Sequence, residues 1–237
     1  MPILHFPRQF NGPPQSANGG VAAGALAGIL LSEATTAVRV RLMRPIPLEQ
    51  DLALRNHPER DGLIAHDDDG DILAGWREPL TIDMPALPDG ERVVEAGAHY
   101  RMPTDDKFAG CFVCGHTRLP GEGLRIHAGH DQEEKAFAAV HWTPHENFAG
   151  DDGELPSHLV WGALDCPGAV AAMLLKNSDM LTGEMHGQVF APVRAGETYT
   201  VFAWPIWTAG RKVFTGSALI DKTGQVCAKA SELWITV

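Results

Sequence analysis

A single carboxylate, that of Asp165, interrupts an otherwise apolar stretch of this 237-residue sequence. The apolar residues around it recur at the spacing of one helical face, and Pro156-Ser157 before them is typical of a helix start. A carboxylate in such surroundings is costly unless it is paired, hydrogen-bonded or used in chemistry. The stretch therefore predicts a helix over 157–175 that carries either a structural hydrogen-bonding group or a general base.

A second apolar segment, over about 16–33, begins at Asn18-Gly19-Gly20. Backbone amides at a helix N-terminus carry partial positive charge and can stabilise an oxyanion. The two glycines leave these amides open to an approaching group. The alternative is that the glycines only permit close packing of a helix against a sheet.

The composition excludes several classes of function. The formal net charge is −11 at pH 7, which disfavours binding to nucleic acid or to an anionic membrane. The longest apolar run, around Val21 to Leu31, is too short to span a bilayer, and the N-terminus lacks a basic-then-apolar signal pattern. With four cysteines, we expect a cytoplasmic protein with no nucleic-acid or membrane partner.

The chain repeats itself once, which sets the predicted domain organisation. Residues 44–54 resemble 191–201, residues 69–74 resemble 223–228, and each half has one apolar helix followed by strands with tight turns. We expect an N-terminal module over 1–90 with a short first strand, a Pro- and Asp-rich linker over 91–107, and a C-terminal module over 108–237. The order of elements predicts an α+β protein with two antiparallel sheets, each wrapped around a long central helix.

Several segments together resemble the tandem, or double, hotdog thioesterase-like proteins. They are Phe10 through Gly20, Arg44-Pro-Ile-Pro-Leu48, Cys111-Phe-Val-Cys114-Gly115 through Leu124, and Trp161-Gly-Ala-Leu-Asp165-Cys-Pro-Gly168. The resemblance covers nearly the whole chain. It implies an acyl-CoA or acyl-carrier-protein thioester as substrate, no cofactor, and a site in which a helix carboxylate from one module faces the glycine-marked helix start of the other. A homo-oligomer is compatible with it.

The two helices depart from that pattern in complementary ways. In the first, Asn18 replaces the histidine found in many members, and Leu26 occupies the position of the acid. In the second, Asp165 is present, but Leu159 and Val160 replace the glycines. The resemblance thus implies one composite site made of Asn18, Gly19, Gly20 and Asp165, and an inactive twin.

Further substrate-binding candidates come from both helix and strands. Glu232 stands in the last predicted strand, where the resemblance implies a polar pocket residue, although it and its counterpart Glu78 would equally suit solvent. Arg211 is a candidate contact for CoA phosphates, with a solvated turn as the alternative. The remaining candidates are His158, Trp161, Thr182 and Gln188.

Cys111 and Cys114, followed by His116, have the spacing of half a zinc site. No second Cys-x-x-Cys follows, so the ligands would have to be completed by histidines at 127, 130, 141 or 145. A thioredoxin-like pattern is missing too, and the resembling family carries this stretch in proteins not regarded as metalloenzymes. We therefore expect no metal, and a turn packed near the pocket.

Hydrolysis of an acyl thioester is the function that these features favour, with Asp165 as base. Two alternatives remain open from the sequence. The first is an acyl-CoA hydratase or dehydratase on the same fold, because His158 lies seven residues before Asp165. The second is a non-catalytic acyl-ligand binding protein, because the first helix has no acid.

Overall fold

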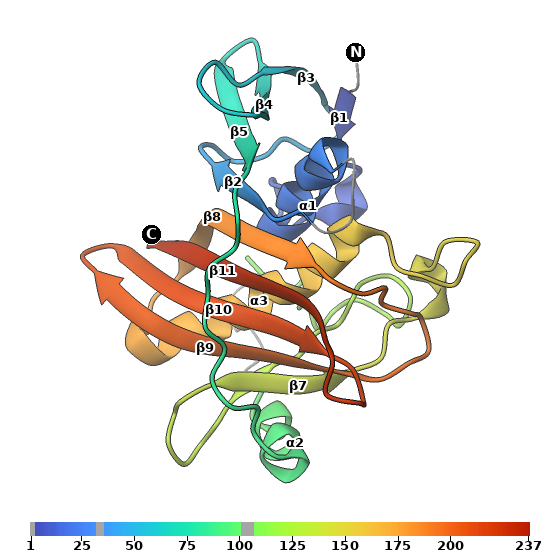
Figure 1. Ribbon diagram of the computed structural model, residues 1–237, viewed down its shortest axis with the longest axis vertical. Coiled ribbons are helices and arrows are strands. Elements are labelled where there is room, and N and C mark those ends of the chain that lie inside the picture. Colours follow the sequence, from blue (N-terminus) through green and yellow to red (C-terminus); the bar gives the residue numbers. More distant parts are fainter. Residues whose placement is uncertain (1–2, 32–35, 101–106) are drawn as a thin grey trace.

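The computed structural model describes residues 3–31, 36–100 and 107–237, and its two longest helices pack side by side against one face of an antiparallel sheet (Figure 1). The helices are α1 (Gly19–Leu30), α2 (Gly90–Ala98) and α3 (Ser157–Leu175), with short 3-10 turns η1 (Arg8–Phe10) and η2 (Glu146–Phe148). The strands of the first half are β1 (Ile3–His5), β2 (Val38–Leu42), β3 (Asp51–Asn56), β4 (Gly62–Asp67) and β5 (Gly70–Arg77). Those of the second half are β6 (Gly129–His130), β7 (Ala138–Trp142), β8 (Met180–Val189), β9 (Tyr199–Ala209), β10 (Lys212–Ile220) and β11 (Val226–Thr236).

The strand order shows the internal repeat directly. The sheet runs β1-β3-β4-β5-β2-β8-β11-β10-β9-β7-β6. The first half reads outward from the centre as β2-β5-β4-β3-β1, and the second as β8-β11-β10-β9-β7, so equivalent strands occupy equivalent places. β2 and β8 pair antiparallel at the centre, with Val40 opposite Met185, as expected for two copies related by a pseudo-two-fold axis.

The prediction of two separate sheets was wrong. The structure has one continuous sheet of eleven strands, because β2 and β8 hydrogen-bond to each other across the junction. An unpaired edge strand exposes a row of backbone N–H and C=O groups. Pairing these two edges satisfies both rows and joins the halves into one sheet.

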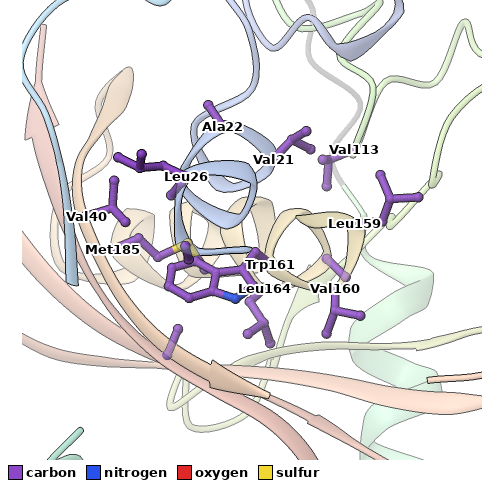
Figure 2. Packing of buried hydrophobic residues seen from close by; sticks show 14 of the residues in the cluster. Val21, Ala22, Leu26, Val40, Val113, Leu159, Val160, Trp161, Leu164 and Met185 are labelled. Atoms are coloured by element: carbon purple, nitrogen blue, oxygen red, sulfur yellow. The ribbon is translucent and has the colours of Figure 1, made fainter. Parts of the chain in front are cut away.

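The helix predictions hold for the described residues. α3 spans Ser157–Leu175, the predicted range, and α1 spans Gly19–Leu30 within the predicted 16–33, of which residues 32–33 lie outside the described residues. α1 is rich in glycine and alanine, and these small residues let it approach α3 closely. Figure 2 shows Leu26 of α1 in the same core as Trp161 and Leu164 of α3 and Met185 of β8.

The segment that connects the halves crosses the sheet on the face away from α1 and α3. In Figure 1 it runs from β5 to α2 as a thin green tube in front of β11, β10 and β9. Lys229 of β11 donates to the carbonyl of Ile82, which fastens this segment to the sheet. The predicted linker over 91–107 contains most of α2, which packs on β7, while its residues 101–106 lie outside the described residues.

α3 is long and apolar enough, by length and composition alone, to cross a membrane. In the structure 61% of its apolar window is buried inside the protein. It lies between α1 and strands β9 and β10, as the central helix of the second half. Its hydropathy is therefore that of a core helix.

Candidate functional site

The Asp165 carboxylate lies in the interior, at the contact between the two halves. It is 3% exposed. Oδ2 accepts a hydrogen bond from Nδ2 of Asn18 at 2.8 Å, and Oδ1 accepts one from Oγ1 of Thr182 at 2.8 Å. The backbone N–H of Gly20 donates to the same carboxylate. Asp165, Asn18 and Gly20, which the sequence predicts to meet, do meet.

Glycine is required where α1 begins, because α3 and β8 leave no space for a side chain. A Cβ at Gly20 would lie 2.5 Å from Cβ of Asp165 and 2.8 Å from the carbonyl oxygen of Trp161. A Cβ at Gly19 would lie 2.6 Å from Oγ1 of Thr182. The close packing foreseen as an alternative for these glycines is therefore present, and it is also what brings the amides of α1 to the carboxylate.

A β-bulge directs Thr182 toward Asp165. Glu184 pairs with Leu233 while Thr182 pairs with Trp234, so Gly183 is an extra residue in β8. An extra residue reverses the alternation of side chains beyond it. Without the bulge, Thr182 would lie on the face of the sheet away from α3.

Burial raises the pKa of the Asp165 carboxyl to about 6, and the hydrogen bonds from Thr182, Asn18 and Gly20 oppose that rise. Desolvation disfavours the charged form of an acid, whereas donors directed at the carboxylate favour it. Such a carboxyl can exist in either protonation state near neutrality, as an acid–base group must.

Glu232 of β11 is a second buried acid next to α3. It is 2% exposed and accepts hydrogen bonds from Thr215, at 2.6 Å, and from Ser217. Its Oε2 lies 2.9 Å from where a Cβ of Gly168 would be, one turn along α3 from Asp165. Burial raises the pKa of the Glu232 carboxyl well above its ordinary value, and the charge of Asp165 adds to this. Glu232 is thus an interior group, and the solvent-facing alternative is excluded.

Two of the predicted substrate-binding residues lie elsewhere on α3. Trp161 is 1% exposed and packs among α1, α3 and Gly187 of β8, so it is a core residue. His158 lines a surface depression of about 520 Å³ together with Phe10 and Phe148. Seven residues of helix separate it from Asp165 by about 10 Å along the axis.

Gln188 and Arg211 are not brought to Asp165. Met185 and Gly187 face the helices, so Gln188, one residue further along β8, lies on the other face of the sheet. Arg211 donates through Nε and Nη2 to the carbonyl of Thr236, at 3.0 and 2.8 Å. Its turn lies beside Lys176 at the C-terminal end of α3, about 15 Å along the axis from Asp165.

A cluster of three thiols borders the site, and the sequence predicted only two of its members. Cys166 joins Cys111 and Cys114, with the three Sγ atoms within 4.8 Å of one another. Nδ2 of Asn18 lies 4.0 Å from Sγ of Cys111 and 3.9 Å from Sγ of Cys166. Cys166 directly follows Asp165, but no local pattern links it to a Cys-x-x-Cys pair 55 residues earlier.

The histidines considered as zinc ligands have other contacts. His130 bonds the carbonyl of Val170, His141 bonds Thr200, and His145 accepts from the N–H of Asn147. His127 stacks on Tyr100 with ring centroids 4.5 Å apart. Among the described residues, the three thiols form the one group with metal-ligand geometry.

The fold and the site define an α+β double-hotdog protein with one buried carboxylate between its halves. Solved structures of this kind match the chain over nearly its full length. A tesB protein from Mycobacterium avium subsp. paratuberculosis matches with a TM-score of 0.62 at 13% identity, over 99% of this chain and 92% of that one. A hot dog fold protein of unknown function from Alicyclobacillus acidocaldarius matches with 0.65 at 11% identity, over 99% and 92%.

An acyl-CoA thioesterase II from Mycobacterium marinum is similar as well, with a TM-score of 0.57 at 12% identity, over 92% of this chain and 89% of that one. No protein-family model and no curated protein sequence matches the chain. At these identities the likeness shows the fold, which is the double hotdog of thioesterase II structures, as the sequence resemblance predicts.

Proposed function

We propose that the chain is a cytoplasmic enzyme that hydrolyses an acyl-CoA or acyl-carrier-protein thioester at the junction of its two halves. One observation carries the proposal: the buried Asp165 carboxylate is held by Asn18 from one half and by Thr182 from the other. The similarity to an acyl-CoA thioesterase II structure supports the substrate class.

Solvent is nearest to the site on the side of Gly19 and Thr182. Both residues are half-buried, whereas Asn18, Gly20 and Asp165 are buried. A Cβ on Gly19 would lie 2.6 Å from Oγ1 of Thr182, so the two residues are neighbours. We infer that a thioester reaches the site from this side, where Gly19 and Thr182 are the residues nearest to solvent.

The chemistry follows from these positions. Asp165 takes a proton from a water molecule held by the Thr182 hydroxyl, and the water oxygen bonds to the thioester carbonyl carbon. The carbonyl oxygen becomes an oxyanion, which the partial positive charge at the start of α1 stabilises. Collapse breaks the C–S bond, and the departing thiolate takes the proton from Asp165, leaving a carboxylic acid and a free thiol.

One site per chain is expected. The position that would carry an acid in α1 is held by Leu26, which is fully buried in the core. α1 begins with two glycines, whereas α3 begins Ser157-His158-Leu159-Val160, with no glycine in its first turn. The twin junction therefore has neither the carboxylate nor the glycines of the first site.

Measuring thiol release from a panel of acyl-CoA and acyl-carrier-protein thioesters tests the proposal. On the best substrate, Asp165→Asn is expected to lower kcat/KM by about 10²–10⁴, the usual cost of losing a general base. Asp131→Asn is the matched control, because Asp131 is another buried acid, paired with Arg92 instead. Circular dichroism reports whether each variant is folded. Hydrolysis by Asp165→Asn at the wild-type rate would make Asp165 a structural carboxylate.

The geometry disfavours the hydratase alternative. That chemistry pairs a histidine with an acid at hydrogen-bonding distance, but His158 is about 10 Å along the helix from Asp165. The acyl-binding alternative keeps one supporting observation: Asp165 does not line the depression beside His158. Acyl-CoA binding with no hydrolysis by the wild-type chain would establish that function instead.

A further inference from the structure

We propose that Cys111, Cys114 and Cys166 form a three-thiolate binding site for a zinc ion, independent of whether the neighbouring Asp165 site hydrolyses thioesters. The expectation of no metal rested on the lack of a second Cys-x-x-Cys, on the need for histidines to complete the site, and on the resembling family, whose members with this stretch are not regarded as metalloenzymes. The fold brings a third thiol, Cys166 of α3, to the other two, and three thiols together favour a metal site.

The spacing of the sulfur atoms fits a tetrahedral ion. Zinc–sulfur bonds of about 2.3 Å at tetrahedral angles place the sulfurs about 3.8 Å apart. Sγ of Cys111 lies 3.9 Å from Sγ of Cys166, and all three sulfurs lie within 4.8 Å of one another. A disulfide would need an S–S distance of about 2.05 Å, and the described cysteines are all free.

The backbone from Cys111 to Gly115 is folded as a turn around the first sulfur. The N–H of Gly115 donates to the carbonyl of Cys111 at 2.8 Å. A Cβ on Gly115 would lie 2.4 Å from that carbonyl oxygen, so only glycine closes the turn. This turn holds Cys111 and Cys114 with their sulfurs on the same side, next to Cys166.

The surroundings favour metal-bound thiolates. Cys111 is buried and Cys114 and Cys166 are half-buried, so uncompensated thiolates would be costly there. A divalent ion leaves one net negative charge on three thiolates, and the Asn18 amide lies within 4.0 Å of two of the sulfurs to interact with it. Zinc is the divalent ion best suited to thiolate ligands in a tetrahedral site.

Such an ion would join two parts of the chain through its ligands, with a third part in contact with the sulfurs. Cys111 and Cys114 belong to the segment that follows the connection between the halves, Cys166 belongs to α3, and Asn18 caps α1. Three protein ligands leave the fourth position to a ligand from outside the cluster, which we assign to water.

The experiment uses the full chain, reduced with a phosphine, freed of metal with a chelator and reconstituted with Zn²⁺ alone. We expect about one zinc per chain by elemental analysis, and loss of that zinc in both Cys114→Ser and Cys166→Ser. Cys227→Ser is the matched control, because Cys227 is also buried but bonds the carbonyl of Gln225, outside the cluster. It is expected to retain the zinc. Zn²⁺ should raise the Tm of the wild type and of this control only.

X-ray absorption of the zinc-loaded wild type tests whether three sulfurs bind the zinc, even where a serine variant does not fold. Three sulfurs at about 2.3 Å and one lighter atom are expected in the first shell. Fewer than three sulfurs, zinc retained by both serine variants, or no stoichiometric zinc after reconstitution would each overturn the proposal. If the reduced chain does not bind Zn²⁺ and instead forms a Cys111–Cys166 disulfide in air, the zinc proposal is wrong and the cluster is a redox pair.

Discussion

Asn18 and Asp165 are 147 residues apart in the sequence, yet Nδ2 of Asn18 donates a 2.8 Å hydrogen bond to Oδ2 of Asp165. The other end of the same amide caps α1, since Oδ1 accepts from the N–H of Val21 at 3.0 Å. The cap requires an oxygen at that end, which directs the NH₂ group at the carboxylate. One side chain therefore begins a helix of the first half and fixes the orientation of the acid in the second.

The contact between the start of α1 and Asp165 predicts a contrast between two glycines of the same helix. Gly20→Ala should lower the free energy of unfolding by about 1–3 kcal/mol, because the new Cβ overlaps Asp165 and Trp161. Gly28→Ala should raise it by about 0.5–1 kcal/mol, because nothing lies within 4 Å of its Cβ and alanine favours a helix. Urea unfolding measures both, and equal effects would show that the helix junction tolerates a methyl group.

The hydrogen bond from the Thr182 hydroxyl to Asp165 predicts that two conservative variants at this position differ in kcat/KM. Thr182→Val keeps the volume but loses the hydrogen bond to Oδ1 of Asp165. A hydrogen bond to a charged group is worth about 1.5–3 kcal/mol, so kcat/KM should fall about 10- to 100-fold. Thr182→Ser retains the hydroxyl and should stay within about threefold of the wild type by the same reasoning. Steady-state kinetics on the best thioester compare them, and equal rates for the valine and serine variants would remove Thr182 from the mechanism.

Local patterns were enough to predict the parts of the site that depend on one element each. The apolar spacing around Asp165 predicts α3, and Asn18-Gly19-Gly20 predicts the start of α1, because caps and periodicity act within a few residues. That these two helices face each other followed from the internal repeat. Their contact in the structure agrees with it.

The remaining features depend on how distant strands pair, which periodicity does not encode. The bulge at Gly183 sets whether Thr182 faces the helices, and the pairing of β2 with β8 makes one sheet from the expected two. The interior position of Glu232 depends on Thr215 and Ser217 of the neighbouring strand. Cys166 meets Cys111 only once α3 has packed against the segment before it.

Glu232 predicts a pH-dependent contribution to stability. Its facing groups are Thr215 and Ser217 of β10 and Asp165 of α3, and burial raises the pKa of its carboxyl in the folded state. The folded chain then binds a proton that the unfolded chain releases, so this stabilisation is complete below the unfolded pKa and declines as pH rises toward the folded pKa. Glu232→Gln cannot titrate, so its free energy of unfolding, relative to the wild type, should be higher at pH 8 than at pH 5. A constant difference between the two proteins across this range, measured by urea unfolding, would show that Glu232 is not held protonated.

The asymmetry of the two halves gives the last prediction. Leu26 stands where α1 would carry an acid, and it is fully buried in the core between the halves. Leu26→Asp should therefore cost at least about 3 kcal/mol of stability, because it removes core packing and buries an acid with no donor arranged for it. Leu26→Met keeps the volume and should cost less than about 1.5 kcal/mol.

The same substitution should not restore hydrolysis to Asp165→Asn. An acid at position 26 would have no glycine-marked helix start to work with, because α3 begins Ser157-His158-Leu159-Val160 and lacks the two glycines that begin α1. Comparing kcat/KM of Asp165→Asn with and without Leu26→Asp measures this, with circular dichroism to record the folded fraction. If the double variant regains even a tenth of the wild-type rate, the twin junction can form an active site. A carboxylate at position 26 would then be all that this second site lacks.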